Sequence, residues 1–234
     1  MKEVNEMANV LDATLYKATL HNDIKAVEDA LNKGANPNAN DFNWNQSTAL
    51  IEACKNGNKD ICLLLISKGA QIGLMDKYDN HPIHYACLNG HSDIAEILVQ
   101  NGADVNIIGY CRHTPLHYAC SKKRGNRKVI RKLISMGADV NRMGHDGWTP
   151  LMVLAENCLT GTMKELIDAG ADKTIKNKKN NTAEDILGCC CPDKLEVIKN
   201  YIRKTERVWN RAQEKRLKKE DQKQDTKTGF EFDI

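Results

Sequence analysis

Apolar residues recur along this chain in short stripes at helical spacing, and the stripes come in pairs. Between Asn80 and Asn106, one stripe falls at positions 83, 86 and 87 and a second at positions 94, 97 and 98, with Asn89-Gly90 between them. Spacing of three to four residues is typical of one face of a helix. Neither stripe extends beyond about three turns, so neither helix would be stable alone. The pattern therefore predicts pairs of short antiparallel helices, each stabilised by packing on the next pair.

A short motif and a glycine repeat this pattern every 33 to 35 residues. The motif Thr114-Pro115-Leu116-His117 has counterparts in Pro82-Ile83-His84 and Thr149-Pro150-Leu151. Thr at a helix N-cap accepts a bond from an unpaired backbone N–H, and Pro at the next position has no N–H to lose. The glycine follows each second stripe, where a left-handed residue ends a helix. These glycines are Gly34, Gly69, Gly102, Gly137 and Gly170. Such a period excludes a single globular core and favours a stacked helical array.

On this motif and these glycines, the chain resembles the ankyrin-repeat family from about residue 10 to residue 203. The resemblance implies an all-α repeat solenoid, in which helix-turn-helix units are joined by β-hairpin-like fingers. It also implies that His84 and His117 hold the loop ahead of their helix by hydrogen bonding. We expect an N-terminal tail at 1–9 and, at 204–234, a basic C-terminal helix extension with a polar, disordered tail. The six expected repeats span residues 10–42, 43–75, 76–108, 109–143, 144–176 and 177–203.

The sequence contains little candidate chemistry. We recognise no glycine-rich phosphate loop, no H-E-x-x-H helix and no nucleophile–His–acid pattern. No apolar run reaches the about 18 residues of a membrane span, and residues 1–9 lack the apolar core of a signal peptide. We therefore expect no enzymatic activity, no cofactor and no membrane contact. The expected location is the cytoplasm, or the nucleus if the basic segment Lys215–Lys219 acts as an import signal.

Nine cysteines leave two interpretations open. Cys54, Cys87 and Cys120 share one repeat position, which fits either a ladder of metal- or redox-active thiols or a small apolar residue at a packed interface. Packed helices lie about 8–10 Å apart, beyond the about 7 Å Cα separation of a disulfide, which favours the second interpretation. Cysteines at positions 189–191 are adjacent and lack the spacing of a zinc site. Without a secretory route, we expect all nine thiols to be reduced and no metal to be bound.

Variable positions at the predicted finger tips form the first candidate surface for a partner. Large aromatic side chains, the commonest hot spots of interfaces, recur there, and we expect them to form an exposed row. The ends of the inner helices would extend this surface along the concave side. The predicted partner-binding residues are Phe42, Trp44, Lys77, Tyr78, Leu88, Asn89, Tyr110, Lys122, His145 and Trp148.

Charge supplies a second candidate surface. Residues 122–132 contain seven basic residues and no acidic one, whereas residues 1–202 as a whole are neutral. An unneutralised run repels itself unless it meets an acidic partner surface or a phosphate. The predicted anion-binding residues are Lys122, Lys123, Arg124, Arg127, Lys128, Arg131 and Lys132. No aromatic residue interleaves the run, which counts against nucleic acid as the partner.

Two asparagines resemble a known modification site. Asn106 and Asn141 each follow Asp-Val, with a leucine eight residues upstream. The pattern resembles ankyrin asparagines that a 2-oxoglutarate oxygenase hydroxylates, so both are candidate modification sites. The same residues are also plain repeat consensus.

These observations predict a monomeric, non-catalytic protein–protein interaction module, or adaptor, that binds a protein partner through its finger tips and concave face. Two alternatives stay open. The first is an anion- or nucleic-acid-binding regulator that acts through the basic cluster 122–132 and the basic C-terminal tail. The second is an effector or inhibitor, secreted into a host or encoded by a virus, that uses the same binding surface.

Overall fold

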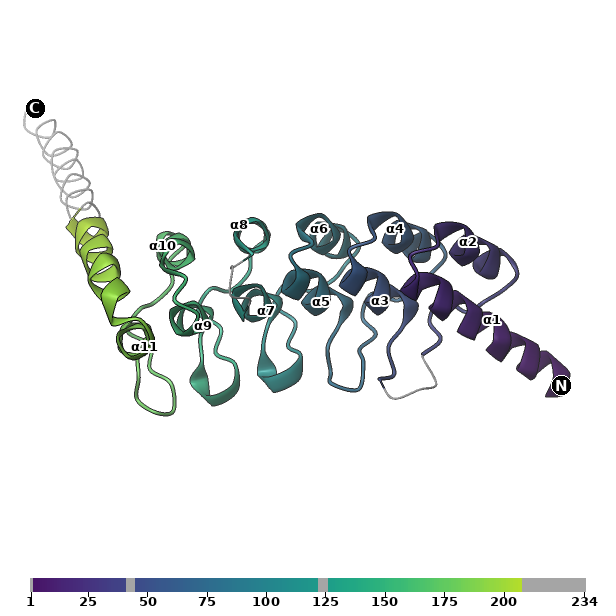
Figure 1. Ribbon diagram of the computed structural model, residues 1–234, viewed down its shortest axis with the longest axis horizontal. Coiled ribbons are helices and arrows are strands. Elements are labelled where there is room, and N and C mark those ends of the chain that lie inside the picture. The colour runs from purple at the N-terminus through teal and green to yellow at the C-terminus, as the bar shows by residue number, and fades with distance from the viewer. Residues whose placement is uncertain (1, 41–44, 122–125, 208–234) are drawn as a thin grey trace, which may run out of the picture.

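The computed structural model describes residues 2–40, 45–121 and 126–207, with side chains from residue 9 onward. It is an elongated stack of helix pairs with fingers projecting from one side (Figure 1). The inner layer consists of α1 (Lys2–Leu20), α3 (Ala49–Asn56), α5 (Pro82–Asn89), α7 (Pro115–Ser121), α9 (Pro150–Glu156) and α11 (Ala183–Cys190). The outer layer consists of α2 (Ile24–Asn32), α4 (Lys59–Ser67), α6 (Ser92–Gln100), α8 (Arg127–Ser135) and α10 (Thr160–Asp168).

The fingers connect one helix pair to the next and are mostly turns. Two of them carry a single 3₁₀ turn at the tip, η1 (Tyr110–Arg112) and η2 (His145–Gly147). Within the described residues, the only strand-like pairing is an antiparallel bridge between Asn40 and Thr48. The fingers therefore have the predicted hairpin path without continuous strands.

Local capping explains where the helices begin and end. The hydroxyl of Thr48 accepts a hydrogen bond from the backbone N–H of Ile51 (3.3 Å), which confirms Thr as the cap of an inner helix. At the equivalent position of the next repeat, the backbone N–H of His81 instead donates to Nδ1 of His84 (3.0 Å). Gly102 follows α6 with φ of +100°, the left-handed conformation expected after an outer helix.

The core is a continuous ladder of small and branched aliphatic side chains between the two layers. Leu98, Leu116 and Leu133 are fully buried in three successive helices, α6, α7 and α8. Burying one such side chain stabilises a fold by about 2–3 kcal/mol relative to exposure. Since α5 packs between α3 and α7, each inner helix depends on both of its neighbours.

The three cysteines that share a repeat position belong to this core. Cys54, Cys87 and Cys120 are fully buried, and none of them forms a disulfide. Burial raises the pKa of the Cys87 and Cys120 thiols well above the ordinary range, so these groups stay protonated at neutral pH. Their place at a packed interface confirms the interpretation as small apolar residues.

One cysteine pair contradicts the expectation that all nine thiols are reduced. Cys158, in the turn between α9 and α10, forms a disulfide with Cys191, which follows α11. Their Cα atoms are 6.0 Å apart, within disulfide range. The helix-packing distance used to argue against disulfides applies to residues within helices. That argument fails here because these two cysteines lie in loops at the ends of successive inner helices. The loops approach each other more closely than the helices do.

The N-terminal end of the array differs from the prediction, whereas the C-terminal end agrees with it. Residues 2–9, predicted to be a tail, instead form the first turns of α1. At the other end, residues 192–207 are helical, so the predicted extension of the last helix past Arg203 is confirmed as far as residue 207. The basic segment Lys215–Lys219 and the predicted disordered tail lie outside the described residues. No helix in the described part of the chain has both the length and the apolarity needed to cross a bilayer.

Candidate partner-binding surface

Two tyrosines at the tips of adjacent fingers form an exposed aromatic pair. Tyr78 is 46% exposed and Tyr110 is 56% exposed. Their ring centroids are 6.2 Å apart and the rings are nearly perpendicular, the edge-to-face arrangement that aromatic pairs prefer. The Lys77 ammonium lies 4.9 Å from the centroid of the Tyr78 ring. The structure thus confirms that Lys77, Tyr78 and Tyr110 are exposed together on one edge of the array.

A buried polar network positions this pair. The side-chain oxygen of Asn80 accepts bonds from the backbone N–H of Tyr110 (3.1 Å) and from the hydroxyl of Tyr118 (2.5 Å). In this way Asn80 connects its own finger to the next finger and to α7. Asp76 accepts backbone bonds from Tyr78 (2.9 Å) and Asn80 (3.0 Å), which fixes the tip of the first finger. Both fingers are therefore pre-organised for binding.

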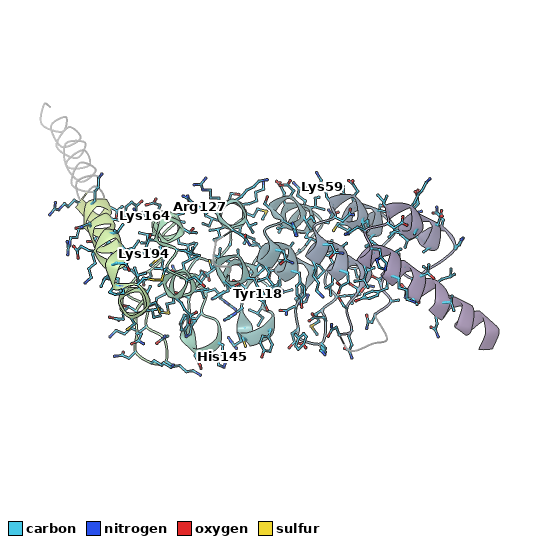
Figure 2. The ribbon with its side chains drawn as sticks, viewed as in Figure 1. Lys59, Tyr118, Arg127, His145, Lys164 and Lys194 are labelled. Atoms are coloured by element: carbon cyan, nitrogen blue, oxygen red, sulfur yellow. A yellow bond between two sulfur atoms is a disulfide. The ribbon has the colours of Figure 1, made fainter. Side chains whose placement is uncertain are left out.

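Two further tyrosines support the network from the inner helices α5 and α7. The hydroxyl of Tyr85 donates to Asp76, while that of Tyr118 donates to Asn80. Burial raises the pKa of Tyr85 well above its ordinary value and that of Tyr118 to about 12, so both hydroxyls remain donors. Tyr118 is labelled in Figure 2, below the inner layer on the finger side. Neither residue was predicted from the sequence, where the same repeat position varies and holds Glu52 in one unit and Val153 in another.

Three exposed aliphatic side chains extend the aromatic pair along the fingers. Met75, Ile108 and Met143 occupy one repeat position and are 51%, 41% and 51% exposed. These three residues were not predicted from the sequence either. The available signal was a large apolar residue at the same repeat position, six residues after Gly69, Gly102 and Gly137, in three successive units. We call the five residues Met75, Tyr78, Ile108, Tyr110 and Met143 the finger stripe.

The other predicted partner-binding residues are placed less uniformly. His145 is exposed at a finger tip (Figure 2), and Asn89 is exposed at the end of α5, where its amide donates to the Lys55 carbonyl (3.0 Å). Leu88 is half-buried. Trp148 was expected to be exposed but is half-buried against the core, because its backbone is held on α7. Phe42, Trp44 and Lys122 lie outside the described residues.

Two buried histidines hold the fingers against the inner helices. Nε2 of His84 donates to the Ile107 carbonyl (3.2 Å), and Nε2 of His117 donates to the Trp148 carbonyl (3.1 Å). Nδ1 of His117 accepts from the backbone N–H of Thr114 (3.2 Å). The role implied by the family resemblance is thereby confirmed. Burial lowers the pKa of each imidazole to about 4, so both are neutral at pH 7.

Every cation in the described part of the basic cluster is paired with a carboxylate, contrary to expectation. Arg127 donates through Nε to Glu165 of α10 (2.9 Å), and Arg131 donates to the same carboxylate (2.6 Å). On the other side, Lys128 pairs with Asp93 of α6 (3.1 Å) and Lys132 pairs with Glu96 (2.5 Å). The missing acids are supplied by the neighbouring outer helices, which a count along α8 alone does not reveal. Lys122, Lys123 and Arg124 lie outside the described residues.

These ion pairs give the outer-layer cations a structural role. Arg127, labelled in Figure 2, lies on α8 in the layer away from the fingers. Its partner Glu165 is only 14% exposed, and the hydrogen bonds from both arginines lower the pKa of that carboxyl despite the opposing effect of burial. An anion that bound these arginines would have to displace Glu165.

Replacing Glu165 by Gln is expected to lower the free energy of unfolding by about 1 kcal/mol, because Arg127 and Arg131 would then repel each other. For a domain of this size the melting temperature should fall by about 2–4 °C. Glu196→Gln is the matched control, since Glu196 pairs with Arg203 (3.1 Å) where both side chains are more than half exposed. Equal melting temperatures for the two variants would show that the pairs on α8 add nothing to stability.

The two candidate modification sites serve as links between repeats. The Asn106 amide donates to the Gly137 carbonyl (3.2 Å), and its oxygen accepts from the backbone N–H of Asp139 (2.7 Å). Asn141 forms the equivalent bonds to Gly170 (3.2 Å) and Asp172 (2.7 Å). Both positions therefore have a structural reason to be Asn. Hydroxylation of either residue stays a prediction.

Within residues 2–40, 45–121 and 126–207, no group of three or more His, Cys, Asp or Glu side chains is placed to hold a metal ion. Four side chains near the fingers with strongly shifted pKa values, His84, His117, Tyr85 and Tyr118, all have hydrogen-bond partners in the network that fixes the fingers.

Comparison with known families gives one result. A family model described as ankyrin repeats (3 copies) matches residues 15–109 and 108–177, which span the helix pairs from α1 to α10. No curated protein sequence matches the chain. With the matched residues covering more than half of its length, the chain belongs to the ankyrin-repeat family.

Proposed function

We propose that this protein is a non-catalytic adaptor that binds one protein partner through the finger stripe and the adjoining concave face. Ankyrin repeats are generally protein–protein interaction modules. The observation that carries the proposal is the finger stripe itself. Its five large apolar side chains are exposed on three successive fingers, with Met75, Ile108 and Met143 at one repeat position, although solvent exposure of apolar surface is unfavourable in the free protein. Large exposed apolar side chains that recur on one side of a protein are typical of an interaction site.

Pre-organisation of the fingers also supports binding. Asn80 and Asp76 fix the backbone on both sides of Tyr78, and His84 and His117 hold the following fingers. Tyrosine side chains have only two torsions to immobilise, so binding on a rigid support loses little conformational entropy. Binding would bury the apolar surface of the stripe without a further loss of conformational entropy in the fingers.

The alternative of an anion- or nucleic-acid-binding regulator is less well supported. Arg127, Lys128, Arg131 and Lys132 are already paired with carboxylates of α6 and α10, so phosphate would have to compete with those bonds. The adaptor would act as a monomer in the cytoplasm or the nucleus. Effector or inhibitor roles in a host would use the same surface.

Changing Tyr78 and Tyr110 together to Ala is expected to weaken partner binding by about 10- to 100-fold, as for central aromatic hot spots. Quantitative affinity capture from an extract of the source cells, with the full chain as bait, measures the effect. The matched control is Leu63→Ala with Val197→Ala, which removes two large side chains that are 42% and 49% exposed away from the fingers. If the same proteins are captured equally by the wild type and both double variants, the finger stripe is not the binding surface.

A further inference from the structure

The charges beside the finger stripe are unbalanced. Lys77, Arg112 and Arg142 are exposed on the three fingers that carry the stripe. Of the two nearby acids at the tips, Asp79 is exposed, whereas Asp146 is engaged by Lys178 (3.0 Å) and lies 3.2 Å from His145. Asp104 and Asp139 are also exposed on these fingers, but they directly follow the outer helices and precede the stripe residues in sequence. Among the residues next to the stripe residues in sequence, the exposed cations Lys77, Arg112 and Arg142 therefore outnumber the one unpaired carboxylate, Asp79.

Close packing accounts for the missing acids. The first finger has Asp76 at a position where the next two fingers have Gly109 and Gly144. A Cβ at Gly109 would lie 2.6 Å from the side-chain oxygen of Asn80, and one at Gly144 would lie 2.4 Å from the His113 ring. A side chain at either position would disrupt the network that ties neighbouring fingers. The remaining acid, Asp76, is buried and bonded to Tyr78, Asn80 and Tyr85, so it adds no exposed negative charge.

The aromatic geometry favours polypeptide over nucleic acid. Base stacking needs a free ring face, but Lys77 lies over the Tyr78 ring and the Tyr110 ring meets it edge-on. Met75, Ile108 and Met143 offer aliphatic surface, which suits apolar side chains. The 6.2 Å between the two rings is close to the about 6.6–6.8 Å that separates side chains two residues apart on one face of an extended segment.

We propose that the finger stripe binds an extended segment of a partner protein in which apolar side chains two residues apart adjoin Asp or Glu residues. The apolar side chains would lie against Tyr78 and Tyr110, while the carboxylates would pair with Lys77, Arg112 and Arg142. This inference rests on the proposed function, and adds the chemistry of the partner to it. Charge complementarity at such a rim governs association rate and selectivity more than total affinity.

A peptide-display library of random twelve-residue segments, selected on the full chain, tests the proposal without a known partner. We expect the selected sequences to be enriched in pairs of apolar residues two apart with neighbouring Asp or Glu. Peptides synthesised from them should bind the variant K77E/R112E/R142E at least tenfold more weakly than the wild type. The matched control K25E/K33E/K59E reverses three exposed charges away from the fingers and should change affinity by less than twofold. Melting curves of all variants verify that they are folded.

The remaining outcomes separate this inference from the proposed function. Peptides that lose binding to Y78A/Y110A, but show no acidic enrichment and tolerate K77E/R112E/R142E, would overturn the partner chemistry while leaving the stripe as the binding surface. Selection of basic peptides or of oligonucleotides in a parallel selection would do the same. Peptides that bind Y78A/Y110A as well as the wild type, or a selection that yields no binder, would overturn both.

Discussion

Lowering the pH from 7 to 5 is expected to reduce the free energy of unfolding by about 4 kcal/mol through two buried histidines alone. Burial lowers the pKa of His84 and of His117 to about 4 in the folded chain, whereas an unfolded histidine titrates near about 6.5. Each imidazole must therefore be neutral for the fingers to stay in place.

The hydrogen bonds explain why protonation is opposed. In each imidazole, Nε2–H donates to a finger carbonyl, and Nδ1 accepts from a backbone N–H of the helix start. A proton on Nδ1 would make it a donor that faces the backbone N–H donor, so this hydrogen bond would be lost. It would also place a positive charge in the core. Both effects act in the folded state only.

The direction in which pH changes stability follows from the lowered pKa values of His84 and His117. A folded pKa below the unfolded one means that stability is complete above about pH 6.5 and is lost as the pH falls towards about 4. At pH 5 each histidine accounts for about 2 kcal/mol. The pKa values of His81 and His113 are also lowered by burial, so they change stability in the same direction. Carboxylates with lowered pKa values, such as Glu165, lose their contribution at lower pH, so pH 5 separates the two effects.

Denaturant unfolding at pH 7 and pH 5 measures this loss. His117→Met is a suitable variant, because the equivalent position of the next repeat is Met152, which is buried in the same way. The variant should be less stable than the wild type at pH 7 but should lose about 2 kcal/mol less on acidification. A wild-type free energy of unfolding that changes by less than about 1 kcal/mol between the two pH values would contradict the assignment of neutral, buried imidazoles.

The repeat architecture could be predicted because each of its signals is local. The period of Gly34, Gly69 and Gly102, and the motif at Thr114, depend only on the residues within one helix pair. The same applies to His84 and His117, whose role follows from their place in the motif. Local consistency repeated in several units leaves few alternative folds.

The surfaces could be predicted only in part, because they depend on neighbouring repeats. Exposure of Tyr78 and Tyr110 follows from their place at finger tips, but the inward position of Trp148 depends on how its backbone meets His117 of the preceding repeat. Pairing of the cations on α8 depends on carboxylates about 35 residues away in sequence, on α6 and α10. Such contacts run across the stack, where sequence order gives no direct guide.

Reducing the Cys158–Cys191 disulfide is expected to destabilise the C-terminal end of the array by about 3–4 kcal/mol. The bond closes a loop of 33 residues, and the loss of loop-closure entropy in the unfolded chain scales with that length. The effect should be local, since repeats contact only their neighbours and a terminal unit is supported on one side. The contacts that remain after reduction include the packing of Ile198 and Ile202, the bond from the Tyr201 hydroxyl to Asp168 (2.7 Å) and the ion pair of Lys173 with Glu206.

Unfolding of the wild type with and without dithiothreitol measures this contribution, and C158S/C191S serves as a control that the reductant should leave unchanged. Thiol titration of the denatured, unreduced chain should find seven free cysteines among nine. Nine reactive thiols, or a wild type whose stability does not respond to dithiothreitol, would show that the bond does not form. The titration also bears on location, because cytosolic reductants keep most protein thiols reduced. A disulfide that persists in protein isolated under thiol-blocking conditions would argue against the proposed cytoplasmic or nuclear location. Free thiols at positions 158 and 191 would agree with that location. The final helix would then be held only by its weaker, non-covalent contacts.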